Sequence, residues 1–470
     1  MLHPCPIHLQ AVEAPDRPAI IDADRQIDYG LLDRLVDGTA QELAAWGMQG
    51  GTRVALYLPN TWRAVVLLAA LVRRGAVACF LSTRLPVTQV QARCREVGAS
   101  LLITDAETLQ GKGVLPPQEL VPEPDPATNP VAVPDWSLAQ PATLVYTSGS
   151  TGRPRAALHT LGNHVYSALG SNRNIAPVPG DRWLLSLPLY HVGGLAICFR
   201  CLLAGAAVVV PVPGEPMGVT LARFGITHVS MVATQLQRLL REGELSALSR
   251  LRAVLLGGSA IPSVLVAQGH ARGLPLFTSY GLTEMASQVT ATPPGATVEQ
   301  LGSSGRVLPF RQLMIAADGE ILVRGETLFQ GYGQGGGGLL TLDADGWYPT
   351  GDLGRLDDGG FLHVTGRKDN LFISGGENIQ PEEIEAALQQ LDGVAQAVVV
   401  PVSDVAFGFR PVAFVQGEGV RLDGLAARLV PTLPKYMIPV AFYAWPAGET
   451  RGMKVDRAFF KAAARQRYHG

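Results

Sequence analysis

Short β-rich runs alternate with helical segments along much of this chain, and this alternation constrains the fold more than any other feature. It is typical of parallel sheets whose strands are joined by crossover helices, so we expect an α/β architecture. The expected strands are Thr52–Leu58, Ala76–Leu81, Ala206–Val212, His228–Val232 and Ala253–Gly257, and the expected helices are Thr61–Arg73, a segment near Leu221–Phe224, and Gln235–Arg241.

The pattern changes twice toward the C-terminus. From about Leu301, short strands separated by tight Gly and Asp turns predict hairpins or a small barrel. Farther along, a helix with proline near its first position and acids in its first turn begins at Pro381, and strands and a final helix follow it. We place a domain boundary near Asp369, which gives domains of residues 1–368 and 369–470.

Composition excludes several classes of protein. The 470 residues are 47% hydrophobic and 17% charged with a net charge of −2, which disfavours a disordered chain and one that coats nucleic acid or an anionic membrane. Five cysteines form no disulfide framework, and no signal peptide is visible. The apolar stretch from Leu184 to Val210 is interrupted by Pro188, His191 and Arg200, so a soluble cytoplasmic protein is expected.

A loop rich in hydroxyls and glycines follows an expected strand near Thr147. Glycines let backbone N–H groups converge on phosphate oxygens, hydroxyls add donors, and arginine adds positive charge. The spacing is not GxxxxGK[ST], so an ordinary P-loop NTPase is disfavoured, and a phosphate-binding loop is favoured over a polar surface loop. The loop residues are Thr147, Ser148, Gly149, Ser150, Thr151, Gly152, Arg153, Pro154 and Arg155.

Two other patterns match known motifs by letter only. Gly331–Gly336 fits GxGxxG, but it runs into further glycines instead of the helix that a dinucleotide fold needs, so we predict a flexible loop. Cys198 and Cys201 fit CxxC without a second Cys or His pair, so two small core residues are expected instead of a zinc site.

The loop at Thr147–Arg155 resembles the phosphate-binding loop of the adenylate-forming superfamily, which includes acyl- and aryl-CoA synthetases, peptide-synthetase adenylation domains and luciferase. Further superfamily motifs follow in order, so that the resemblance extends from about Leu144 to Arg457. The similar segments are Tyr280–Glu284, Tyr348–Asp352, Gly366–Asp369, Ser374–Glu377 and Gly452–Arg457.

The resemblance implies a fold and an activity. A large N-terminal domain of two α/β subdomains plus a small barrel would be followed by a small, mobile α+β domain that carries the catalytic lysine. ATP, Mg²⁺ and coenzyme A would be the cofactors, and an aromatic carboxylic acid would be the substrate. Neither a nucleic acid partner nor membrane insertion is implied, and a homodimer stays open.

The resemblance also implies roles for individual residues. Lys454 would neutralise charge at the α-phosphoryl group, Glu284 would hold Mg²⁺, and Asp369 would be the hinge between the domains. Catalytic roles fall on Lys454, His191, Thr283 and Glu284. ATP and AMP would contact Thr147, Ser148, Gly149, Ser150, Thr151, Gly152, Arg155, Gly257, Gly258, Ser259, Tyr280, Gly281, Thr283, Asp352 and Arg367. Coenzyme A would contact Ser374, Gly375 and Gly376, and the acid would contact His191, Gly194, Thr234, Gln235 and Ser287.

Within the superfamily, four segments are most similar to the 2-succinylbenzoate–CoA ligases of menaquinone biosynthesis. We therefore expect 2-succinylbenzoate to be activated through an acyl-AMP intermediate to its CoA thioester. The second carboxylate of this substrate needs a partner, which the sequence does not identify. The segments are Leu185–Ile197, Tyr280–Ser287, Gly366–Glu383 and Val400–Val412.

Three alternatives remain: a CoA ligase for another aromatic acid such as a benzoate, a stand-alone enzyme that loads a carrier protein, and a non-catalytic nucleotide-binding scaffold. Two positions also depart from the superfamily pattern. Arg155 stands where lysine is usual, which keeps the charge but changes its geometry. Met453 precedes Lys454 where glycine is commoner.

Overall fold

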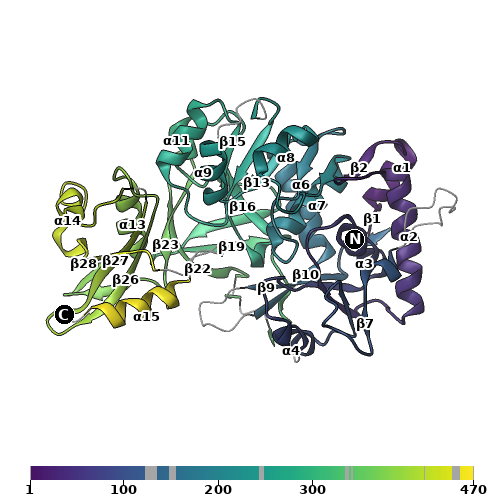
Figure 1. Ribbon diagram of the computed structural model, residues 1–470, viewed down its shortest axis with the longest axis horizontal. Coiled ribbons are helices and arrows are strands. Elements are labelled where there is room, and N and C mark those ends of the chain that lie inside the picture. Colours follow the sequence, from purple (N-terminus) through teal and green to yellow (C-terminus); the bar gives the residue numbers. More distant parts are fainter. Residues whose placement is uncertain are drawn as a thin grey trace.

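The computed structural model describes residues 2–121, 135–147, 155–242, 248–333, 338–339, 342–343, 345–417, 419–446 and 456–468. Within these ranges the chain forms four larger sheets and one short strand pair (Figure 1). The elements near the C-terminus, in yellow, lie at the end of the elongated molecule opposite to the first helices, in purple.

The first sheet is mixed, and four central strands are parallel: β9 (Pro141–Thr147), β5 (Val77–Phe80), β4 (Arg53–Tyr57) and β6 (Leu101–Thr104). Val54, Ala55 and Leu56 in β4 are fully buried, as expected for a parallel strand covered on both faces. The order of the sheet is β21 (Gly338–Leu339), β20 (Gly331–Tyr332), β10 (Arg155–Thr160), β9 (Pro141–Thr147), β5 (Val77–Phe80), β4 (Arg53–Tyr57), β6 (Leu101–Thr104) and β7 (Val114–Leu115).

The second sheet has a parallel centre and antiparallel edges. The predicted α/β architecture is confirmed by these two sheets. The order is β17 (Arg306–Val307), β16 (Ser287–Ala291), β15 (Leu276–Leu282), β14 (Ala253–Leu256), β13 (His228–Met231), β11 (Arg182–Leu184), β12 (Ala207–Val209), β2 (Pro18–Ile21) and β3 (Gln26–Asp28).

Helices form the layers around and between these sheets. The largest hydrophobic core lies between the two sheets, and it is filled by α1 (Pro6–Glu13), α2 (Tyr29–Ala45), α3 (Trp62–Arg74), α6 (Leu161–Ile175) and α7 (Val192–Ala204). A second core packs α8 (Met217–Phe224), α9 (Ala233–Glu242) and α11 (Ser263–Ala271) on the second sheet, and a third packs α4 (Val87–Val97) on the first sheet. Shorter elements are β1 (Leu2–His3), α5 (Pro117–Leu120), β8 (Trp136–Ser137) and α12 (Val298–Leu301).

Helix ends follow local sequence signals. The Thr61 side chain accepts a hydrogen bond from the backbone N–H of Ala64 and caps the start of α3. Gly75, with φ of +68°, ends the same helix in the left-handed conformation that glycine tolerates best. The predicted helix Thr61–Arg73 is thus confirmed to within one residue at each end.

A four-stranded antiparallel sheet follows, with the order β18 (Arg311–Ile315), β19 (Glu320–Gly325), β22 (Tyr348–Leu356) and β23 (Leu362–Arg367). It is the half-barrel counterpart of the predicted small barrel. The last sheet combines β25 (Glu377–Ile379), β24 (Phe372–Ser374), β27 (Gly408–Gln416), β26 (Gln396–Asp404) and β28 (Ala441–Ala444). Around it are α13 (Pro381–Gln389), α14 (Leu425–Leu429), the 3₁₀ helix η2 (Lys435–Met437) and α15 (Arg457–Arg467).

Three local predictions need correction. The strand expected over Ala206–Val212 is only β12, because Pro211 has no N–H to donate to a neighbouring strand. Helix α8 begins at Met217, earlier than expected, directly after Pro216. The expected flexible loop at Gly331–Gly336 begins as strand β20, which pairs with β10, whereas residues 334–336 lie outside the described ranges.

All five cysteines are free, and four of them are buried; Cys94 is half-buried. Burial raises the pKa of the Cys94 thiol to about 11 and that of Cys198 to about 12. Cys198 and Cys201 lie in the core within α7, as the sequence predicts. Among the described helices, none combines the length and apolar character that crossing a bilayer requires.

Candidate active site

Several predicted nucleotide-binding residues lie where strands of the two large sheets end. Thr147 is the last residue of β9, Gly257–Ser259 follow β14, and Tyr280 lies in β15. The carboxyl ends of parallel strands are the usual ligand-binding edge of such sheets. A Cβ on Gly257 would lie 2.8 Å from the Ser279 Oγ, so only glycine fits there without a shift.

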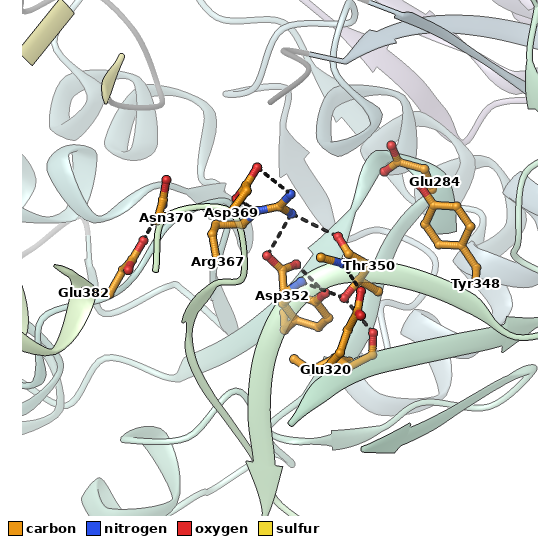
Figure 2. Close-up of polar contacts among 12 residues, drawn as sticks. Glu284, Glu320, Tyr348, Thr350, Asp352, Arg367, Asp369, Asn370 and Glu382 are labelled. Atoms are coloured by element: carbon orange, nitrogen blue, oxygen red, sulfur yellow. Dashed lines mark hydrogen bonds and ion pairs between the residues drawn. The ribbon is translucent and has the colours of Figure 1, made fainter. Parts of the chain in front are cut away.

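The Asp352 carboxylate lies at the centre of a polar cluster formed by β15, β22 and β23 (Figure 2). Its Oδ2 accepts a 2.6 Å hydrogen bond from the Tyr280 hydroxyl, and its Oδ1 lies 3.0 Å from Nη1 of Arg367. Arg367 also donates to the Thr350 carbonyl at 3.0 Å and from Nε to the Asp369 carboxylate at 3.1 Å. The antiparallel register puts Asp352 directly opposite Arg367, so the cluster follows from strand pairing.

Charge and burial define the state of this cluster. Tyr280 is only 9% exposed, and burial together with the Asp352 carboxylate raises the pKa of its hydroxyl well above the usual value. Burial lowers the pKa of the Arg367 guanidinium, but its ion pairs with Asp369 and Asp352 outweigh this and raise it. The result is a neutral phenol and a cation that both point at one carboxylate, whose remaining lone pairs can accept hydroxyl groups.

Glu284 lies in the 3₁₀ helix η1 (Thr283–Met285), which directly follows β15. Its Oε1 accepts a 2.6 Å hydrogen bond from the Tyr332 hydroxyl. That hydroxyl is 3.1 Å from the Tyr348 hydroxyl and 3.1 Å from Nη2 of Arg155. Figure 2 shows Glu284 beside Tyr348, at a distance along the strands from Asp352. The predicted metal ligand and the predicted phosphate-binding arginine are therefore joined through one tyrosine.

This carboxylate fits the Mg²⁺ ion that the resemblance implies. Mg²⁺ takes one or two carboxylates together with substrate phosphates and water, not a dedicated cage of protein ligands. Within the described ranges, no group of three or more His, Cys, Asp or Glu side chains could hold a metal ion by itself. Glu284 is half-buried and its Oε1 is bonded to the Tyr332 hydroxyl, which leaves Oε2 as a hard oxygen ligand.

The backbone around η1 is strained, and a hydrogen bond from a buried histidine holds it in place. The Thr283 carbonyl accepts a 2.7 Å hydrogen bond from Nε2 of His159, so this ring nitrogen carries the proton. Ala286 and Ser287 have φ of +51° and +114°, values that cost about 1–3 kcal/mol each in residues with a Cβ and that concentrate at functional sites. Gly281 permits this turn, since a Cβ there would lie 2.1 Å from the Ser287 carbonyl oxygen.

The predicted acid-pocket residues come from three elements. His191 occupies the N-cap position of α7, and its ring lies 4.7 Å from the adjacent Tyr190 ring between centroids. Gly194 is buried where a Cβ would lie 2.2 Å from the Pro188 carbonyl oxygen. In α9, Thr234 is exposed, while the Gln235 side chain accepts a hydrogen bond from the N–H of Val232. The Gln235 amide oxygen is therefore occupied by its own helix terminus.

A buried arginine joins the pocket beside Ser287. Arg200 in α7 is 1% exposed; its Nη2 lies 2.8 Å from Oε1 of Gln288 and 3.4 Å from Oγ of Ser287. No carboxylate among the described residues forms an ion pair with it, and its Nε has no hydrogen-bond partner. Burial lowers the pKa of Arg200 to about 10, but the guanidinium still carries its charge at neutral pH.

The predicted coenzyme A loop lies beyond Asp369. Ser374 ends β24 and is buried, and Gly375 and Gly376 follow with φ of +57° and +90°. The Gly375 N–H donates to the Phe407 carbonyl, so the turn packs against the β26–β27 hairpin. Two other predicted groups, Ser148–Gly152 and the segment that contains Lys454, lie outside the described residues.

The residues after Lys454 are firmly attached to α13. Arg457 donates from Nη1 to Glu385 at 2.7 Å and from Nη2 to Glu382 at 3.1 Å. Glu382 also accepts a 2.6 Å hydrogen bond from Asn370, the residue after the predicted hinge Asp369. The start of α15 is therefore connected through α13 to the segment around the hinge. Figure 2 shows the Asn370–Glu382 part of this connection.

Sequence reasoning missed two side chains of this site, Tyr332 and Arg200. Tyr332 lies in the glycine-rich segment that the sequence predicts to be a loop, and the signal available there is an aromatic residue between glycines. Arg200 was visible as the charge that interrupts a long apolar stretch. Burying a charged side chain in such a stretch is costly unless the charge has a partner or a function. This cost is the signal that could have identified Arg200 as a site residue.

Comparisons with known proteins agree with this geometry. The profile of the family described as AMP-binding enzyme matches residues 7–333. A 2-succinylbenzoate–CoA ligase of Bacillus licheniformis is 33% identical over 459 residues, which cover 94% of this chain and 96% of that protein.

Solved structures of o-succinylbenzoate CoA synthetase from Bacillus subtilis are also similar. The complex with the acyl-adenylate intermediate OSB-AMP superposes with a TM-score of 0.87 at 31% identity and covers 98% of both chains. The complex with ATP and magnesium ion has a TM-score of 0.84 at 31% identity and covers 95% of this chain and 96% of that chain. The chain described here therefore belongs to the family of AMP-binding enzymes.

Proposed function

We propose that this chain is an AMP-forming acid–CoA ligase that activates 2-succinylbenzoate to its CoA thioester through an acyl-adenylate. The observation that carries the proposal is the carboxylate of Asp352, held by Tyr280 and Arg367 at the ligand-binding edge of the sheets. Such a carboxylate is suited to accept two ribose hydroxyls. The similar proteins that cover nearly the whole chain support the choice of acid.

In the first half-reaction, the residues of the site position and neutralise charge. Asp352 would hold the ribose, Arg155 and the loop from Thr147 would hold phosphate oxygens, and Lys454 would stabilise the charge that develops at the α-phosphorus. Glu284 would hold Mg²⁺, which supplies Lewis-acid stabilisation of the phosphates when bound. The substrate carboxylate then attacks the α-phosphorus, and pyrophosphate leaves.

The second half-reaction requires the C-terminal domain to change its position relative to the N-terminal domain. We propose that these domains are residues 1–368 and 369–470 and that they move about Asp369. Support comes from the hydrophobic cores, because the two clusters after Phe372 contain no residue from the preceding part of the chain. Ser374–Gly376 would then approach the thioester site, where the CoA thiolate displaces AMP. The free cysteines fit a reducing compartment such as the cytoplasm.

We also propose that Arg200 binds the second carboxylate of 2-succinylbenzoate. A buried guanidinium without an acidic partner is costly unless an anion completes its environment. Arg200 touches Ser287, which the resemblance places at the acid pocket, and its Nε is free to donate. A monocarboxylate such as benzoate would leave this charge unpaired, so Arg200 would also select the substrate.

Replacing Arg200 with methionine tests this role. We expect kcat/KM for 2-succinylbenzoate to fall about 10–100-fold, because a charge-assisted hydrogen bond contributes about 1.5–3 kcal/mol. The KM for ATP should stay unchanged, and any activity on benzoate should not fall. Arg173→Met removes an exposed arginine from the neighbouring helix α6 and serves as the matched control. Equal losses on both acids would contradict the assignment.

The function itself is tested by pyrophosphate release with Mg·ATP and a panel of aromatic acids, with and without coenzyme A. We expect the highest kcat/KM with 2-succinylbenzoate, a CoA thioester as the product, and turnover that depends on coenzyme A. Turnover only with simple benzoates would support an acid–CoA ligase but contradict 2-succinylbenzoate as its substrate. Absence of adenylation with every acid would reject the proposal in favour of a nucleotide-binding scaffold.

A further inference from the structure

The Tyr332 hydroxyl is the meeting point of three polar side chains. It lies 2.6 Å from Oε1 of Glu284, 3.1 Å from Nη2 of Arg155 and 3.1 Å from the Tyr348 hydroxyl. The guanidinium carbon of Arg155 is also 3.9 Å from the centroid of the Tyr332 ring. Arg155 therefore contacts both the face and the hydroxyl of this tyrosine.

Chemistry fixes the direction of each hydrogen bond. A guanidinium only donates and a carboxylate only accepts, whereas a phenol has one proton and two lone pairs. Tyr332 must therefore accept from Arg155 and give its single proton to Glu284. No proton is left for Tyr348, so the Tyr348 hydroxyl must be the donor of that pair. Arg155 and Tyr348 thus both donate to the Tyr332 hydroxyl, which in turn donates to Oε1 of Glu284.

The backbone holds Tyr332 in this position. Strand β20 pairs with β10, with Tyr332 opposite Ala157 in the strand that begins at Arg155. The Phe329 ring packs edge-on against the Tyr332 ring at 4.9 Å between centroids, and the Phe329 N–H donates to the Glu284 carbonyl at 2.8 Å. One short segment thus fixes both the main chain and the side chain of Glu284.

We infer that Tyr332 is a positioning residue that orients the Glu284 carboxylate for the magnesium ion of Mg·ATP and ties it to Arg155. The inference rests on the proposed function, because it takes Glu284 as the metal ligand. Mg²⁺ demands near-octahedral geometry, so a carboxylate with one oxygen fixed by a phenol presents the other in a defined direction. Outer partners of this kind typically change metal affinity about 10–100-fold when removed.

The test measures binding, without turnover. Calorimetry with a non-hydrolysable ATP analogue, adenylyl imidodiphosphate, gives its dissociation constant in EDTA and in saturating Mg²⁺. The ratio of the two constants reports how much the metal tightens nucleotide binding. In Tyr332→Phe we expect this ratio to fall about tenfold while the constant in EDTA changes less than about twofold. Phenylalanine keeps the ring beneath Arg155 and removes only the hydroxyl.

Two further variants separate positioning from folding. Tyr146→Phe removes another tyrosine hydroxyl that contacts a carboxylate, that of Glu96 at 3.3 Å, and should leave the ratio unchanged. In a Glu284→Gln background, Tyr332→Phe should lower the ratio no further, because the two residues act on one ligand. Additive losses in that double variant would overturn the inference, since they would show that Tyr332 acts independently of Glu284.

An unchanged ratio in Tyr332→Phe would also overturn the inference, as would nucleotide binding in the unaltered protein that does not respond to Mg²⁺. Neither result depends on the acid substrate. A protein that binds Mg·nucleotide as expected but gives no thioester from 2-succinylbenzoate would instead reject the proposed function and leave the role of Tyr332 supported.

Discussion

Replacing Lys454 with alanine is expected to lower acyl-adenylate formation about 10²–10³-fold, which is the loss typical when one preorganised charge is removed from a transition state. ATP binding should change little, because this charge acts as the carboxylate attacks and not before. Pyrophosphate release with saturating 2-succinylbenzoate measures the loss, and calorimetry with the ATP analogue measures binding. The helix that follows keeps its own anchors, since Asp456 caps α15 and Arg457 is bonded to Glu385.

The matched control is Lys461→Ala. Lys461 is the other lysine near this end of the chain, and it lies partly exposed within α15. Its loss removes the same charge seven positions farther along the chain, at a residue to which no site role is assigned, so the activity should stay within about twofold. If Lys454→Ala retains most of its adenylation activity, the charge at the α-phosphoryl group comes from another residue, and Arg155 is then the first to replace.

Asp352→Ala should raise the KM for ATP about 10²–10³-fold, because it removes an acceptor of two charge-assisted hydrogen bonds. The same change leaves the Tyr280 hydroxyl buried without its partner, which costs about 1–3 kcal/mol of unfolding free energy. Thermal or denaturant unfolding measures this second effect separately from the kinetics. The weaker ATP binding and the lower free energy of unfolding have different causes, so a second mutation can separate them.

The double variant Tyr280→Phe/Asp352→Ala makes this separation. Removing the orphaned hydroxyl should restore most of the lost stability while the KM for ATP stays high. Asp358→Ala, an exposed aspartate in the turn between β22 and β23, is the control for loss of negative charge in this hairpin. A KM that recovers together with stability would mean that Asp352 supports the fold and does not bind the ribose.

Local signals explain why much of the fold could be predicted from the sequence. The Thr61 cap and the Gly75 terminus are encoded within a few residues of α3, and buried strands such as β4 are continuous apolar runs. The predicted boundaries of strands and helices were wrong where a single proline determines where the element begins or ends. Pro211 shortens β12, and Pro216 starts α8 earlier than apolar periodicity suggests.

The site was predictable where the chemistry lies in one contiguous motif and less so where it depends on pairing between distant strands. Asp352 and Arg367 come together because β22 and β23 form a hairpin of short separation. Tyr332 reaches Arg155 only because β20 adds to β10, a pairing across more than 170 positions that no local pattern encodes. Arg200 was visible as a charge, but its burial beside Ser287 is a property of packing between α7 and β16.

The free cysteines described in the fold have a practical consequence for measuring this reaction. A thiol of pKa about 11, such as Cys94, is ionised in about one molecule in a thousand at pH 8, and only thiolates react with disulfide reagents. Burial raises the pKa of Cys79 and Cys201 as well. The thiol of coenzyme A in solution should therefore react far ahead of these side chains. A colorimetric thiol reagent can follow consumption of coenzyme A continuously in the presence of the native enzyme.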